Sequence, residues 1–340
     1  MQSDFISEAS VEKNVLNPQY DELEKDFFTK LKRQGKSPNT LKNYKTDLDC
    51  FKTFMDNSRP VIKLGEMGPA QIKHYGEYLE NKYNSDNSRR RRVQALRLFF
   101  DYLIEVGVFN ENPVRQIPTS PKFLDIPRPA PLVEIKTLWQ FLLEEAQKPG
   151  DALSTLLAKR NLIMVMMIFG SGLKVSDLEE LTRDHVSVDG NKARVLIEHG
   201  KRDPYTIPLP DIFVDIYLDY IESLDRHLSD TRHQFKKLLF SANAYSILGG
   251  GLSARGIEVI FEEWRKKLML TLTPKSLRQA CIFFWLQQKE SESLIKEWLG
   301  LAPSYSLKLY KDHMMDSIYD QSFLEYSFYQ ALRAHSLPRV

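Results

Sequence analysis

The chain has 340 residues, of which 42% are hydrophobic and 27% charged, so it is long enough for two compact domains with cores of their own. Its net charge of +2 excludes a strongly basic protein, and a nucleic-acid-binding surface would have to arise from segregation of charge. The two cysteines, Cys50 and Cys281, are far apart, show no metal-binding spacing and are typical of a reduced cytoplasmic protein.

The N-terminal part is predicted to be a loose arm followed by a helical domain. Residues 1–20 show no clear period, and the first ten contain acidic residues and no apolar core, so they are not a signal peptide. Residues 21–117 follow a helical pattern with no convincing strand. Ser37 can cap a helix that begins at Pro38. A later helix of this domain carries apolar residues at helical spacing, namely Val93, Leu96, Phe99, Phe100, Leu103 and Ile104.

A proline-rich connector separates this domain from the second one. Five prolines fall within residues 118–131, and such density favours an extended, semi-rigid linker. Residues 132–312 are predicted to form the second domain, with a buried helix at 153–169 whose apolar run is far too short to cross a bilayer. Alternating residues at 186–197 and 204–209 predict a hairpin or small sheet, and the chain after them returns to helix.

Four consecutive arginines, Arg89, Arg90, Arg91 and Arg92, lie at the start of a predicted helix. Cations at a helix N-terminus interact unfavourably with the helix dipole. The run is therefore either a solvated helix end or a contact for an anion, and phosphate is the natural anion for four arginines together.

A series of short motifs runs through both domains in a fixed order. They are Ser37-Pro38-Asn39-Thr40-Leu41 with Tyr44, Asp47 and Leu48, then Gly172-Leu173-Lys174 with Leu181, then Thr273-Pro274-Lys275 with Arg278, then Leu299-Gly300-Leu301, and finally Tyr310. Over roughly residues 20–312 the chain resembles the tyrosine recombinases, and among them the bacterial Xer-type and phage-type integrases.

The resemblance implies a mainly α fold with a small β-sheet, arranged as a two-domain, C-shaped clamp around duplex DNA. It also implies that DNA is cut and rejoined through a 3′-phosphotyrosine link, without a metal, nucleotide or other cofactor. The implied partners are double-stranded DNA and further copies of the chain, as a dimer to tetramer on DNA, possibly with a homologous recombinase. No membrane partner is implied.

The family's catalytic residues match five positions in this chain. The tyrosine nucleophile matches Tyr310, the second arginine matches Arg278, and the first arginine is replaced by Lys174. The histidine that precedes the second arginine is replaced by Lys275, and the hairpin lysine matches either Lys201 or its neighbour Arg202. The hydroxyl of such a tyrosine attacks a phosphodiester whose charge the cations stabilise.

The residues expected to contact DNA are a second group. They are Lys42, Lys45, Arg89, Arg90, Arg91, Arg92 and Arg202.

Several site positions depart from the family pattern. Lys174 keeps the charge of an arginine but loses the bidentate fork, and Lys275 is a poorer proton shuttle than histidine. Leu301 stands where the family has a hydrogen-bond donor, and Tyr205 stands where an arginine is common. Two hypotheses follow: an active recombinase or integrase, or a recombinase-like DNA-binding protein with weak or no cleavage that acts as an accessory factor or regulator.

The C-terminal tail, residues 313–340, is predicted to be helical with an apolar face. That face would pack either into a neighbouring protomer or onto its own domain. Its residues are Ile318, Phe323, Leu324, Phe328 and Leu332.

Overall fold

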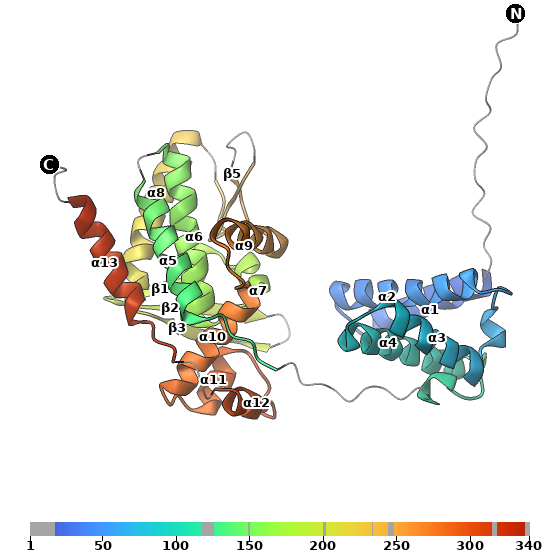
Figure 1. Ribbon diagram of the computed structural model, residues 1–340. Coiled ribbons are helices and arrows are strands. Elements are labelled where there is room, and N and C mark those ends of the chain that lie inside the picture. The colour runs from blue at the N-terminus through green and yellow to red at the C-terminus, as the bar shows by residue number, and fades with distance from the viewer. Residues whose placement is uncertain are drawn as a thin grey trace, which may run out of the picture. The chain divides into compact units, whose positions relative to one another are not determined.

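The computed structural model describes residues 18–116, 126–148, 150–199, 202–232, 234–243, 248–314 and 318–336. The chain divides into two compact units, Met1–Phe123 and Leu124–Val340 (Figure 1). The predicted fold class is confirmed, since both units are built mainly from helices and the second contains a small sheet. Most of the predicted arm and of the predicted linker lies outside the described residues.

The first unit is a bundle of four helices with two short 3-10 turns. Its elements are α1 (Pro18–Arg33), α2 (Pro38–Asn57), η1 (Leu64–Glu66), α3 (Pro69–Lys82), α4 (Asp86–Glu105) and η2 (Pro113–Gln116). Helix α1 begins at Pro18, so the last three residues of the predicted arm are helical. The described residues of this unit, 18–116, contain no strand, as the sequence pattern indicated.

Helix α2 begins where the sequence predicts. The side chain of Ser37 accepts a hydrogen bond from the Thr40 N–H, and Pro38 occupies the first turn, where its missing N–H is not needed. The buried face of α2 packs on α4 through aromatic residues such as Phe51 and Phe100, whose ring centroids are 6.1 Å apart. These rings are part of the buried apolar core that holds the bundle together.

The second unit contains the remaining helices and two small sheets. Its helices are α5 (Leu132–Gln147), α6 (Ala152–Ser171), α7 (Val175–Glu180), η3 (Arg183–His185), α8 (Phe213–Thr231), α9 (Ala254–Leu268), α10 (Pro274–Gln287), α11 (Glu292–Trp298), α12 (Lys308–Asp312) and α13 (Ser322–Ser336). Its strands are β1 (Val186–Asp189), β2 (Lys192–His199), β3 (Arg202–Leu209), β4 (Ser241–Ala242) and β5 (Leu248–Gly249).

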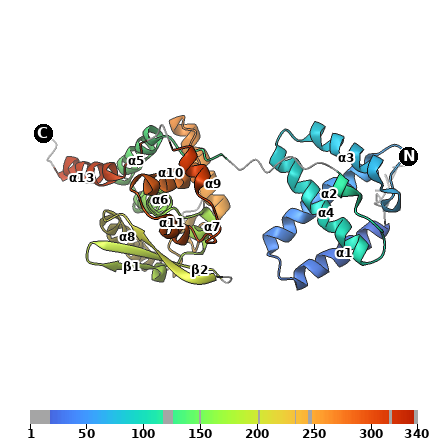
Figure 2. The ribbon, with the colours of Figure 1, turned by 90° about the horizontal axis from the view of Figure 1, so that it is seen from below.

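Helix α6 is the central element of this unit. It packs against α5, α8, α10 and β3, and Figure 2 shows it among its neighbours. All residues from Leu162 to Ser171 are buried, which confirms the buried helix predicted at 153–169. By length and composition α6 could cross a membrane, but 61% of its apolar window is buried inside the unit, as in the core helix of a globular domain.

The larger sheet has the strand order β1-β2-β3, with antiparallel pairing throughout. Val195 pairs with Ile207, and Ala193 pairs with Leu209, so the buried residues of β2 and β3 share one face. The predicted small sheet is therefore confirmed. The expectation that the chain is entirely helical after residue 210 was wrong, because β4 and β5 pair there.

Helix α13 packs on its own domain, against α5. Phe323, Leu324 and Phe328 are buried, and the Trp139 indole N–H donates to the Leu324 carbonyl at 3.3 Å. The predicted apolar face is only partly used, because Ile318 is 82% exposed and Leu332 is also exposed. Packing on its own domain is thus the arrangement of this tail in the structure.

Gly172 provides a test of the turn that ends α6. Its φ is +65°, and an added Cβ would lie 2.9 Å from the ring of Trp285. We expect Gly172→Ala to lower the free energy of unfolding of the second unit by about 2–3 kcal/mol, through both backbone strain and collision. Urea unfolding followed by tryptophan fluorescence measures this, because all four tryptophans, at 139, 264, 285 and 298, lie in this unit.

Gly190→Ala is the matched control for this variant. Gly190 has a similar φ of +60°, but nothing lies within 4 Å of the added Cβ, so only the backbone cost of about 1 kcal/mol applies. If both variants lost the same free energy of unfolding, the collision with Trp285 would contribute nothing to the cost of Gly172→Ala.

Candidate functional site

The turn between α6 and α7 presents Lys174. Gly172 ends α6 in the left-handed conformation, and Lys174 is the N-cap residue of α7. The Lys174 N–H donates to the buried Asp177 carboxylate at 3.1 Å, which fixes the turn. The Lys174 side chain itself is exposed. Asp177 was not singled out from the sequence, although a carboxylate three residues after a helix start is a recognisable capping signal.

Helix α10 presents Lys275 and Arg278 one turn apart. Thr273 caps the helix by accepting from the Ser276 N–H at 3.1 Å, and Pro274 occupies the first turn. Lys275 is exposed, whereas Arg278 is half-buried.

Arg278 joins this helix to the turn that carries Lys174. Its Nε donates to the Gly172 carbonyl at 2.5 Å, across 106 residues of sequence. Among the residues that the structure describes, Arg278 makes no other hydrogen bond, so its terminal amino groups are left to meet an anion. Two motifs that are distant in the sequence are thereby held together.

The surroundings of Arg278 shift the pKa of its guanidinium. Burial lowers the pKa of its guanidinium, and the nearby Asp177 carboxylate acts in the opposite direction. A half-buried guanidinium is less screened by water than an exposed one, so it attracts an anion that enters the site.

Tyr310 lies on α12, which packs against α10. Its ring is half-buried, and its centroid lies 5.9 Å from that of Phe283 on α10. The structure therefore brings Tyr310 to the helix that carries Arg278, as the motif order implied. Tyr305, the neighbouring tyrosine, is 44% exposed.

The Leu299-Gly300-Leu301 segment forms the turn after α11. The Gly300 and Leu301 N–H groups donate back into α11, to the carbonyls of Glu297 and Lys296 at 2.9 and 2.8 Å. Leu301 is half-buried and packs against the core of the unit. Neither its side chain nor its N–H is thus available to bind a ligand.

Tyr205 on β3 reaches the same turn. A Cβ built on Gly300 would lie 2.5 Å from the Tyr205 hydroxyl oxygen, so the hydroxyl occupies the volume of the missing side chain. The sequence marked Tyr205 only as a departure from the family pattern, and no local signal connects it with residue 300.

The two predicted hairpin cations lie at the turn between β2 and β3. Lys201 lies outside the described residues, and only the backbone of Arg202, at the start of β3, is described. Their roles stay predictions. Among the residues described, no three His, Cys, Asp or Glu side chains are grouped as a metal site would require.

The four-arginine run does not form a uniform cationic surface. Arg89 pairs with Asp86 and Arg91 with Asp47, while Arg92 is buried with its guanidinium 3.7 Å from the centre of the Tyr83 ring. Arg90, half-buried on α4, makes no hydrogen bond or ion pair with any residue that the structure describes.

The Arg91–Asp47 pair is the strongest of these contacts. Asp47 is fully buried, and its Oδ1 accepts from both Nε and Nη2 of Arg91, at 3.2 and 2.8 Å. The exposed end of Arg91 is therefore held in one orientation by an anion of its own domain.

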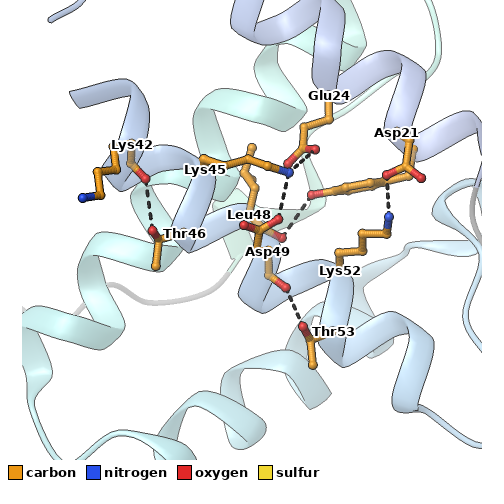
Figure 3. A network of polar contacts seen from close by, with 10 residues as sticks. Asp21, Glu24, Lys42, Lys45, Thr46, Leu48, Asp49, Lys52 and Thr53 are labelled. Atoms are coloured by element: carbon orange, nitrogen blue, oxygen red, sulfur yellow. Dashed lines mark hydrogen bonds and ion pairs between the residues drawn. The ribbon is translucent and has the colours of Figure 1, made fainter. Parts of the chain in front are cut away.

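The two lysines expected to contact DNA also differ in whether an acidic side chain of their own domain holds them. Figure 3 shows the polar network around Lys45, whose ammonium donates to Glu24 at 2.7 Å and pairs with Asp49 at 2.8 Å. Glu24 is buried, so this network lies against the core, and the burial raises the pKa of the Glu24 carboxyl. Lys42 is exposed, and its ammonium has no ion pair among the described residues.

Comparisons with known proteins agree with this architecture. Residues 22–119 match the family described as phage integrase SAM-like domain. The chain is 25% identical to tyrosine recombinase XerD of Listeria innocua serovar 6a over 280 residues, which cover 82% of this chain and 89% of that protein. It is also 25% identical to tyrosine recombinase XerC of Lacticaseibacillus casei, over 81% of this chain and 88% of the relative.

Two solved structures share the fold. A lambda integrase dimer bound to a COC′ core site aligns with a TM-score of 0.61 at 16% identity, over 88% of this chain and 79% of that chain. The XerH site-specific recombinase bound to a palindromic difH substrate aligns with a TM-score of 0.62 at 16% identity, over 90% of this chain and 83% of that chain.

The buried Asp47 provides a test of the role of Arg91. We expect Arg91→Ala to destabilise the first unit by about 2 kcal/mol, because it leaves a buried carboxylate without its charge partner. Hydrogen exchange of the α2 and α4 amides measures the loss. Arg90→Ala is the control and should change stability by less than about 0.5 kcal/mol. Equal protection in both variants would contradict the structural role of the pair.

Proposed function

Because this chain belongs to the tyrosine recombinase family, we propose that it binds duplex DNA and that Tyr310 breaks and rejoins its strands. The observation that carries the proposal is the joining of the motifs: Arg278 is tied to Gly172, beside Lys174, and Tyr310 packs on the same helix as Arg278. A phosphate bound by Arg278 would then lie within reach of a phenolic nucleophile.

Each residue has a distinct role in the proposed reaction. The Tyr310 hydroxyl loses its proton and attacks a backbone phosphorus, a tyrosyl–phosphate bond forms, and the bond from phosphorus to the 5′-oxygen breaks. The leaving 5′-oxygen takes up a proton. Arg278, Lys174 and Lys275 stabilise the charge that develops on the phosphate oxygens, and Lys201 would add to this from the hairpin.

Binding itself is proposed to rely on distributed phosphate contacts in both units. In the first unit, Arg90 and Lys42 are the best candidates, since the other expected cations are held by acidic side chains or buried. We propose that the chain assembles on DNA as a dimer to tetramer. Lambda integrase has been solved both as a dimer bound to a COC′ core site and as a tetramer bound to a Holliday junction. The cytoplasm is its proposed location.

A second candidate function is DNA binding with little or no cleavage, as an accessory factor or regulator. It is favoured by the three departures at the site: Lys174 lacks the fork of an arginine, Lys275 replaces a histidine, and Leu301 offers no hydrogen bond. Losing one preorganised donor can cost about 10²–10³ in rate. DNA affinity would survive these losses, because it does not depend on any single contact.

Covalent capture separates the two functions. The probe is a nicked suicide duplex whose sequence is recovered by selecting a random duplex library with the full-length protein. We expect a covalent adduct with the wild-type protein, and none with Tyr310→Phe, whose DNA affinity should stay within about threefold since only the attacking oxygen is lost. Tyr305→Phe is the control and should form the adduct normally. Wild-type binding without any adduct would favour the accessory role.

Lys174 tests whether the altered site keeps recombinase geometry. We expect Lys174→Arg to raise the single-turnover rate of adduct formation about tenfold, because a planar fork can hold two phosphate oxygens where an ammonium holds one. Lys308→Arg, a change of the same kind at an exposed position of α12, controls for unspecific gain of affinity. A slower Lys174→Arg variant would mean that the lysine belongs to a working variant of the site.

A further inference from the structure

The position of Leu301 leaves the site without a donor that its chemistry needs. An apolar side chain cannot donate, and the Leu301 N–H is already bonded to the Lys296 carbonyl at 2.8 Å. The Gly300 N–H is used in the same way, by the Glu297 carbonyl. A donor at this corner of the site must therefore come from another segment of the chain.

Tyr205 supplies a hydroxyl at this corner. Its oxygen lies 2.5 Å, and its Cζ 3.0 Å, from the place that a Cβ of Gly300 would take. The ring is half-buried against the core of the unit, and β3 packs against α11, so the hydroxyl is carried by a rigid element. Gly300, with a φ of +60°, has no side chain that could displace it.

The turn that Tyr205 reaches lies beside the end of α6, because the Leu299 side chain is 3.5 Å from the place that a Cβ of Gly172 would take, and the Gly172 carbonyl accepts from Arg278. A phosphate held by the amino groups of Arg278 would therefore lie near the Tyr205 hydroxyl at Gly300 and near Tyr310, whose helix α12 packs against α10. We propose that Tyr205 donates a hydrogen bond to a non-bridging oxygen of the attacked phosphate and so replaces the donor lost at Leu301. This inference rests on the proposed function, and it adds a substrate-contacting residue to it.

The other side chains near this corner are less suited to the role. His313 follows Tyr310 by one turn, but its Nδ1 donates to the Leu309 carbonyl at 2.9 Å and the side chain is exposed. Tyr305 is exposed on the loop that precedes α12. Tyr205, by contrast, is half-buried on a strand that packs against α11.

The test compares Tyr205→Phe with Tyr305→Phe on the selected nicked duplex. Tyr205→Phe keeps the ring and removes only the hydroxyl, so we expect the single-turnover adduct rate to fall on the order of 10²-fold, while Tyr305→Phe matches the wild type. Adding Leu301→His should recover more activity in the Tyr205→Phe background than in the wild-type background. A tyrosine that merely packs would show no such dependence, because histidine at 301 restores a donor and not the packing.

A second measurement keeps the inference separate from strand cleavage. DNA affinity is measured in the Tyr310→Phe background, with the unnicked duplex as probe, and loss of the Tyr205 hydroxyl should weaken it about fivefold. If the wild type binds but forms no adduct, cleavage by Tyr310 is refuted and this affinity still decides the role of Tyr205. The proposal would be overturned if Tyr205→Phe changed both the adduct rate and the DNA affinity by less than twofold, each relative to the matching protein that keeps Tyr205.

Discussion

The hydrogen bond from Arg278 to the Gly172 carbonyl is the interaction on which the candidate site depends. It links the second turn of α10 to the end of the central helix α6, so that the two cationic motifs are held together. The guanidinium satisfies a carbonyl at a helix C-terminus, where acceptors lack intrahelical partners. Because only Nε is used for this link, the rest of the fork can face a ligand without loosening the frame.

Local features of the fold were predictable from the sequence. The start of α2 at Pro38 follows from the capping chemistry of Ser37, and the buried α6 follows from a long apolar run. The two-residue strands β4 and β5 were not predictable, because such short segments show no alternation of apolar and polar residues.

The candidate site was predictable only in part, since its motifs gave the residues but not their partners. Nothing local indicates that Arg278 bonds residue 172, or that Tyr205 fills the space beside residue 300. The same holds for Arg91, whose partner Asp47 lies 44 residues away. Such contacts are decided by tertiary packing, which a periodic pattern does not encode.

The pairing within the arginine run has a consequence for how salt would act on DNA binding. A cation that already neutralises a carboxylate of its own domain releases few counterions when it meets a phosphate, since it gives up one anion for another. Each newly neutralised phosphate adds about 0.9 to the slope of log affinity against log salt concentration. With Arg89 and Arg91 paired and Arg92 buried, the run would contribute a slope near that of one arginine, although it contains four.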